Sequence, residues 1–309
     1  MQKNNPVVDK HVLKTLLYFD IFNYPLKSNE VFRFLGMNSI AEGDVTQSLN
    51  SLVERKLISN FQEFYGLASD ESFVQRRIKG NEKAKGYLPV AHRKALLIAK
   101  FPFVRAVLAS GSLSKDYMDE KSDLDFFIIT ADQRLWIART LLVMYKRIFL
   151  RNSHKHFCVN YFIDETHLEI EEKNQFTATE LATVIPLYNP EAYQQLLSAN
   201  PWLKKFFPNF QPRVTEHTTP QKHGLLKKFT ETFLNLFSKP LEKFFMRLTL
   251  SRLKRIYGKH YSNEDFSTAF KTKKYTSKNH PKHFQRKVID LHLAKLNEFS
   301  DKHNISLLS

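Results

Sequence analysis

Apolar side chains near the start of the chain recur at the spacing of amphipathic helices. Residues 8–22 carry them at three- and four-residue intervals, and a proline-containing break at 23–25 ends that pattern. Similar patterns at 26–35 and 45–53 predict two further helices. The segment 57–67 instead has the pattern of a strand, a turn and a second strand. The chain therefore begins with three predicted helices and a β-hairpin.

This order of elements over residues 1–70 resembles a winged helix-turn-helix module, a fold that often binds DNA. The third predicted helix, where base-reading side chains would lie, carries Glu42, Asp44 and Glu54. The module has a net charge of −1 and lacks the basic surface that DNA phosphates attract. We therefore expect a packing or protein-contact role for it and not sequence-specific DNA binding.

The pattern then changes to basic helix and to apolar strands. Residues 71–100 are rich in Arg and Lys and predict one or two linker helices. Apolar runs at 101–109, 126–129 and 156–163 have the length of buried strands, and 132–150 has helical spacing. Strands interleaved with a helix in this way predict an α+β fold for this part of the chain.

The residues most informative about chemistry lie between the first two of these strands. Gly111 and Ser112 follow the first strand, and Asp123 and Asp125 lie at the start of the second. Alternate side chains of a strand share a face, so both carboxylates should point the same way while Leu124 turns toward the core. Neighbouring carboxylates repel each other unless a cation lies between them, and oxygen ligands suit Mg²⁺.

Gly111-Ser112, a loop, and then Asp123-Leu124-Asp125 in an apolar strand resemble the signature of the DNA polymerase β-like nucleotidyltransferase superfamily. The resemblance implies a mixed sheet with flanking helices over residues 101–172. It implies that the Gly-Ser turn opens a helix that holds a nucleoside triphosphate, and that both Asp side chains ligate Mg²⁺ or Mn²⁺. It further implies transfer of a nucleoside monophosphate to a hydroxyl of an unknown acceptor.

Two more residues belong to this pattern with alternatives left open. Lys115 lies three residues after Ser112, where it is either a phosphate contact or a solvated loop lysine. The family usually supplies a third carboxylate from the next strand, but Asn160 stands at that position here. An amide offers an oxygen ligand without charge and accepts no proton usefully.

Asp164 shares the strand parity of Asn160 and is our candidate for the third catalytic carboxylate, although it is equally suited to a turn at the strand end. Glu169 is a second candidate. The missing acid leaves two hypotheses. The chain is a metal-dependent nucleotidyltransferase, or it is a catalytically weak or inactive module that binds nucleotide, RNA or a protein partner.

Residues 173–309 predict a basic helical region. Thr177–Glu180 resembles a helix-capping box with Leu181 and Ile185 on one face. A basic amphipathic helix over 225–257 is interrupted at Pro240, and 281–299 predicts a last helix after a flexible basic loop that begins at Lys271. The apolar stripe on the 225–257 helix is more typical of core or helix–helix contact than of a membrane surface, although basic amphipathic helices also bind anionic lipid. That stripe comprises Phe229, Phe233, Leu236, Phe244, Phe245 and Leu248.

Charge and composition complete these expectations. The 309 residues carry a net charge of +16, of which +12 falls in residues 221–309. This positive charge either favours binding of RNA or another polyanion, or belongs to helices that are only solvated. No apolar run approaches the length of a membrane span, no secretory signal is visible, and the one cysteine, Cys158, cannot pair within the chain. These features predict a cytoplasmic protein, and the histidine pairs 154/156 and 280/283 lack the partners of a zinc site.

Overall fold

A five-stranded mixed sheet at the centre of the chain organises the computed structural model, which describes residues 5–68, 70–151, 155, 157–222, 224–279 and 284–307. The strands are β1 (Ser59–Phe61), β2 (Phe64–Gly66), β3 (Val104–Ser110), β4 (Asp125–Thr130), β5 (Cys158–Asp164), β6 (Ile185–Tyr188) and β7 (Thr276–Lys278). The helices are α1 (Pro6–Asp20), α2 (Ser28–Arg33), α3 (Glu42–Glu54), α4 (Ser72–Ala99), the 3₁₀ turn η1 (Leu113–Lys115), α5 (Leu135–Phe149), α6 (Gln175–Thr183), α7 (Pro190–Ser198), α8 (Leu203–Phe206), α9 (Leu225–Asn235), α10 (Ser238–Tyr257), α11 (Asn263–Ala269) and α12 (Phe284–His303). The predicted α+β fold is confirmed.

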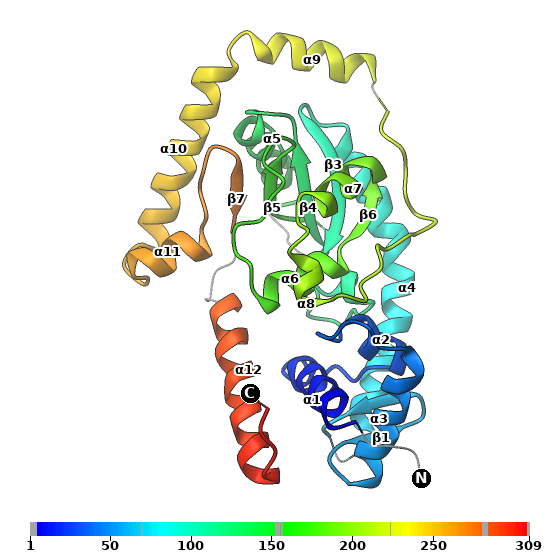
Figure 1. Ribbon diagram of the computed structural model, residues 1–309. Helices are drawn as coiled ribbons and strands as arrows, with labels where there is room; N and C mark the ends of the chain where they lie inside the picture. The colour runs from blue at the N-terminus through cyan, green and yellow to red at the C-terminus, as the bar shows by residue number, and fades with distance from the viewer. Residues whose placement is uncertain are drawn as a thin grey trace.

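The main sheet has the strand order β6-β3-β4-β5-β7, and β4 and β5 are its parallel pair (Figure 1). Successive side chains of a strand point to opposite faces, so β3 and β4 supply two separate cores. Val107 and Phe126 pack on the face that α4 and α5 cover. Leu108 and Phe127 pack on the face covered by α6, α7 and α8. The sheet therefore joins two helical layers.

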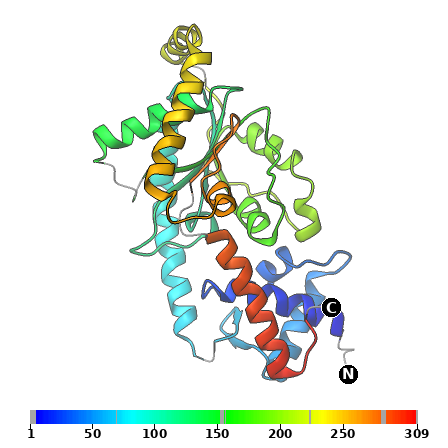
Figure 2. The ribbon, with the colours of Figure 1, turned by 90° about the vertical axis from the view of Figure 1, so that its left-hand side faces the viewer.

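The N-terminal module has the predicted elements, and one long helix connects it to the sheet. Helices α1, α2 and α3 and the β1–β2 hairpin form one layer below the sheet, and α4 is a single helix that runs from that layer to β3 (Figure 1). Helix α12 returns to pack beside α1, as Figure 2 shows from the side. Helices α1 and α12, from opposite ends of the described chain, thus lie in the same layer.

Two strands lie where the sequence predicts helix or loop, and the prediction is wrong there. Helix α6 ends at Thr183, so Ile185 begins strand β6, which pairs with β3. Strand β7 lies in the segment predicted as a flexible basic loop and pairs with β5. Both strands are too short to produce a recognisable alternation, and only pairing with distant residues selects them. The sheet therefore extends beyond the expected boundary at residue 172.

The long basic helix is broken as predicted, but its apolar stripe is not buried. Helices α9 and α10 meet at Leu236–Phe237, and Pro240 lies in the first turn of α10, where its missing N–H costs little. Phe229 and Phe233 remain 72% and 57% exposed. The expectation of a core contact is therefore wrong for most of the stripe. Among the described residues, no helix is both long and apolar enough to cross a membrane.

Candidate functional site

Gly111 ends strand β3 in a conformation that only glycine adopts without strain. Its φ is +63°, and a Cβ atom at this position would lie 2.2 Å from Oδ2 of Asp125. The carbonyl of Ser112 accepts hydrogen bonds from the backbone N–H groups of Lys115 at 3.0 Å and Tyr117 at 3.2 Å. These bonds close the single 3₁₀ turn η1 where the resemblance implied a helix. A turn this short lacks the dipole of a full helix, so phosphate would depend on side-chain cations here.

Strand β4 begins at Asp125, and Asp123 lies in the loop two residues before it. Leu124 is fully buried, and Asp125 pairs with Ser110 on β3 and with Cys158 on β5. Burial raises the pKa of Asp125 to about 6, and the nearby charges of Asp123 and Glu180 act in the same direction. The position of Asp125 therefore disfavours its negative charge, and a bound cation would favour it.

Asn160 on β5 occupies the expected position of the third acid. Its Nδ2 donates a hydrogen bond of 2.9 Å to Oδ1 of Asp125. Its own Oδ1 is buried and has no hydrogen-bond partner among the described residues. A buried polar atom without a partner costs about 1–3 kcal/mol. Carboxylate and amide oxygens, as on Asp125 and Asn160, are the ligand types that suit Mg²⁺ or Mn²⁺.

A cavity of about 360 Å³ opens beside this group and is lined mainly by apolar side chains. Its polar lining includes Ser112, Asp125, Lys115, Glu180 and Lys278. Lys115 Nζ lies 2.7 Å from Oε1 of Glu180, and burial lowers the pKa of Lys278. Two lysines thus line the same cavity as the Asp125 and Glu180 carboxylates. The volume is in the range of small-molecule sites.

The N-terminal module supplies part of the cavity wall. Phe22, in the connection after α1, lines the cavity, and the hydroxyl of Tyr24 donates to the carbonyl of Lys115. Sequence reasoning identified neither residue, nor Glu180 or Lys278, because all four lie outside the motif and reach it only through tertiary packing. The N-terminal module therefore contributes to the wall of this cavity.

Asp164 does not join this site, which makes it wrong as the third carboxylate. It lies at the far end of β5, where it pairs with Thr130 at the opposite end of β4 from Asp125. Its Oδ1 instead accepts from the backbone N–H of Thr166 at 3.1 Å and lies 2.8 Å from Nδ1 of His167. Strand parity fails here, because β5 has a register shift at Asn160, which lies between Val159 and Tyr161, the partners of Phe126 and Phe127. Asp164 therefore lies at the far end of the strand and on the opposite face from Asn160.

Glu169 is also absent from the candidate site. It is exposed and forms an ion pair of 2.6 Å with Lys173. The thiol of Cys158 is hydrogen-bonded to Asp125, and burial raises the pKa of this thiol. Cys158 is therefore a protonated structural group. His154, His156, His280 and His283, the pairs considered for zinc, lie outside the described residues.

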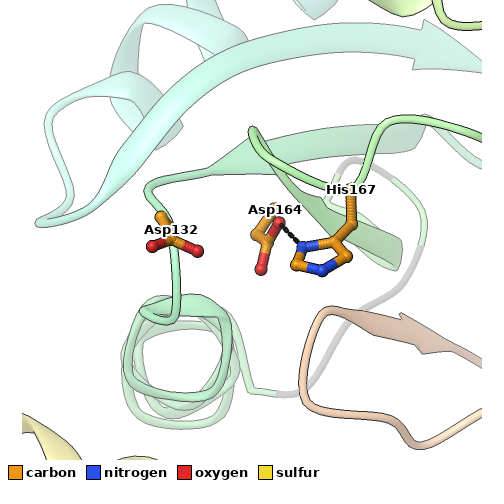
Figure 3. Close-up of side chains that lie close together, drawn as sticks. All are labelled: Asp132, Asp164 and His167. Carbon is orange, nitrogen blue, oxygen red and sulfur yellow. Dashed lines mark hydrogen bonds and ion pairs between the residues drawn. The ribbon is translucent and has the colours of Figure 1, made fainter.

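The side chains of Asp132, Asp164 and His167 form a second polar group at the far end of the β4–β5 pair (Figure 3). One ligand atom from each lies within 4.8 Å of the others. This group is not predicted by sequence pattern, because its members are up to 35 residues apart and meet only through the parallel pairing of β4 and β5.

No protein-family model matches the chain, and neither a curated protein nor a solved structure matches it. Residue geometry alone therefore carries the functional argument.

Proposed function

We propose that the protein is a metal-dependent nucleotidyltransferase that moves a nucleoside monophosphate from a nucleoside triphosphate to a hydroxyl group. One observation carries the proposal. The Asp125 carboxylate packs directly on the Gly111 turn, beside the unpartnered oxygen of Asn160, at the edge of a cavity that also contains two lysines. That combination supports a site for a divalent cation together with a polyanionic ligand.

The chain's residues divide into two groups in this proposal. Asp123, Asp125 and the Asn160 oxygen would hold a divalent ion, which would neutralise charge on the phosphates during transfer. Ser112, Lys115 and Lys278 would contact the triphosphate, and the apolar walls would receive the base. The contribution of the protein is then positioning and charge neutralisation. The basic region over residues 221–309 is our candidate for contacting RNA or another polyanionic acceptor.

Titration calorimetry with each nucleoside triphosphate in the presence of Mg²⁺ tests the binding half of this proposal. We expect binding by the wild type and its loss by at least tenfold in the Asp123→Asn/Asp125→Asn variant. Asp301→Asn is the control, because Asp301 is exposed on α12. Equal binding by wild type and double variant would contradict the proposal.

A second function, binding of nucleotide, RNA or a protein partner without turnover, is favoured by one observation. Asn160 lies against Asp125 at the position where a third acid would complete the site. A screen for label transfer from α-³²P-labelled triphosphates to RNA, protein and small hydroxyl compounds separates the two functions. Transfer that the double Asn variant abolishes supports the enzyme. Binding without transfer to any acceptor supports the non-catalytic module.

A further inference from the structure

A polar cluster lies at the carboxyl ends of the parallel strands β4 and β5 and comprises Asp132, Asp164, Thr166 and His167. Its side chains make more close polar contacts than they have hydrogens to donate. Thr166 Oγ1 lies 2.8 Å from Asp132 Oδ1, 3.0 Å from Asp164 Oδ1 and 3.0 Å from His167 Nδ1. A hydroxyl has one hydrogen, and a neutral imidazole has one at most on this nitrogen. Two hydrogens at most therefore serve these three contacts, so at least one pair of acceptors lies close together without a hydrogen of its own between them.

The Asp164 carboxylate supplies a second, independent observation. Its side chain is 1% exposed, and its Oδ2 is buried without a hydrogen-bond partner among the described residues. In Figure 3 this carboxylate lies between Asp132 and His167. An ionised carboxylate with a bare buried oxygen is costly unless a cation offsets it. The imidazole is also held in place, because His167 stacks on Tyr275 with ring centroids 4.4 Å apart.

We propose that Asp132, Asp164 and His167 bind a divalent transition-metal ion such as Zn²⁺ or Mn²⁺, separately from the Asp125 site. Two carboxylates and one imidazole are a mixed oxygen–nitrogen ligand set that suits these ions better than Mg²⁺. Asp132 and His167 are exposed, so small side-chain movements close the ligand atoms onto one ion. Such an ion would tie the loop after β4 to the loop after β5.

Equilibrium dialysis of the full-length protein against Zn²⁺, with Co²⁺ as a visible-absorption probe, tests this site. In the Asp123→Asn/Asp125→Asn background, which lacks ligands of the other proposed cation site, we expect about one ion per chain. Adding His167→Gln or Asp132→Asn should weaken the affinity at least roughly tenfold. His260→Gln is the control, because His260 is exposed and remote from the group. Unchanged affinity after His167→Gln and Asp132→Asn, or no binding in that background, would overturn the proposal. Because the double Asn variant keeps this site, its outcome is independent of the nucleotide proposal.

A different observation concerns helix α9, which is fixed to the sheet by one face and exposes the other. Lys227 Nζ donates to the carbonyls of Ala99 at 2.8 Å and Val104 at 2.6 Å. Glu231 accepts from the backbone N–H of Phe103 at 2.6 Å and pairs with Arg105 at 2.9 Å. In Figure 1 the helix crosses the top of the molecule. The opposite face of α9 points away from the sheet.

That outward face is apolar and continues onto the start of α10. Leu226, Phe229, Phe233, Leu236 and Phe237 are 77%, 72%, 57%, 74% and 54% exposed. Their spacing of three and four residues makes one continuous stripe. A continuous exposed apolar stripe on a folded protein is typical of an interaction surface.

The charges around the stripe indicate what binds there. Between residues 222 and 259 the only carboxylates are Glu231 and Glu242, and both point inward. Glu242 accepts from the backbone N–H groups of Trp136 and Ile137 at the start of α5. The exposed charges are all cationic, namely Lys222, Lys228, Lys239, Lys243, Arg247, Arg252, Lys254, Arg255 and Lys259. We infer that α9 and the start of α10 dock on an anionic lipid surface.

Co-sedimentation of the full-length protein with phosphatidylglycerol vesicles tests this surface, and phosphatidylcholine vesicles provide the neutral comparison. We expect salt-sensitive binding to the anionic vesicles, weakened at least tenfold by Phe229→Glu/Phe233→Glu. Leu291→Glu/Leu293→Glu on α12 is the matched control, because both residues are 40% or more exposed. No binding to anionic vesicles, or binding that Phe229→Glu/Phe233→Glu leaves unchanged, would overturn the inference. A dimer of the wild type that this double variant dissociates would assign the face to a second copy and would also overturn it.

Discussion

Asp125 links the stability of the protein to its proposed chemistry. Burial raises its pKa to about 6 from 3.8, so the folded state binds this proton more tightly than the unfolded chain does. The free energy of unfolding should therefore fall as the pH rises from about 4 to about 6 and stay low above that range. A bound divalent cation would reverse this effect, because it favours the ionised carboxylate.

Asp125→Asn should consequently stabilise the protein while it removes ligand binding. At pH 8 we expect the free energy of unfolding to rise by up to about 3 kcal/mol, the equivalent of the pKa shift. Urea unfolding between pH 4 and pH 8 measures this, and the variant should lose most of the slope seen in the wild type. A less stable variant at pH 8 would show that Asp125 is not electrostatically strained.

Asn160 offers the reverse experiment, because Asn160→Asp restores the acid that the resemblance implies. Without metal, a second buried carboxylate beside Asp125 should lower the free energy of unfolding by about 1–3 kcal/mol. Millimolar Mg²⁺ should recover most of that loss in a thermal melt at pH 8. Asn160→Ala, which removes the hydrogen bond without adding charge, is the control that Mg²⁺ should not recover. Equal Mg²⁺ effects on both variants would contradict the ligand role of position 160.

At the scale of elements, the turn between β3 and η1 is the part of the site that the fold controls most tightly. Gly111→Ala should cost about 2 kcal/mol or more, because a Cβ at positive φ is strained and this one meets the Asp125 carboxylate. Gly86→Ala is the matched control, since Gly86 lies in α4 with nothing within 4 Å of its added Cβ. That substitution should stabilise the helix by about 0.5–1 kcal/mol. Chemical unfolding measures the stability of both variants. Equal effects would show that Gly111 is not required by the conformation of this turn.

The elements also show which predictions a sequence supports and which it does not. Periodicity and breaks located α1, α3, α5 and α12, because each helix buries a stripe that its own residues encode. The same patterns did not predict β6 and β7, because their few residues become strands only by pairing with β3 and β5. The motif placed Asp125 and Asn160 together correctly, whereas the position of Asp164 depended on strand length and direction that parity alone does not give.

At the scale of the whole molecule, Arg77 of α4 connects the N-terminal module to the rest. It is buried, forms an ion pair of 2.6 Å with Glu30, donates to the carbonyl of Pro25 at 2.8 Å and lies over the ring of Tyr24. Arg77→Met should cost about 3–5 kcal/mol, because Glu30 loses its partner inside the interface. The control Lys79→Met changes an exposed position of the same helix and should alter stability by less than about 0.5 kcal/mol.

Arg77→Met also tests whether the N-terminal module supports nucleotide binding at the sheet. Phe22 lines the cavity and Tyr24 donates to the carbonyl of Lys115, which also lines it, so a loosened module should also weaken nucleotide binding. Urea unfolding and calorimetry on Arg77→Met measure the two effects separately. Loss of stability with fully retained nucleotide affinity would show that the module is not part of the functional site.

The central claim is that Asp123, Asp125 and Asn160 hold a divalent cation beside a triphosphate. Anomalous diffraction from crystals grown with Mn²⁺ and a non-hydrolysable nucleoside triphosphate tests it most directly. If this cation site exists, we expect an anomalous peak within about 2.5 Å of an Asp125 carboxylate oxygen and of Asn160 Oδ1, with the phosphates next to Ser112 and Lys115. Absence of a peak at Asp125, with the nucleotide bound elsewhere or not at all, would contradict it.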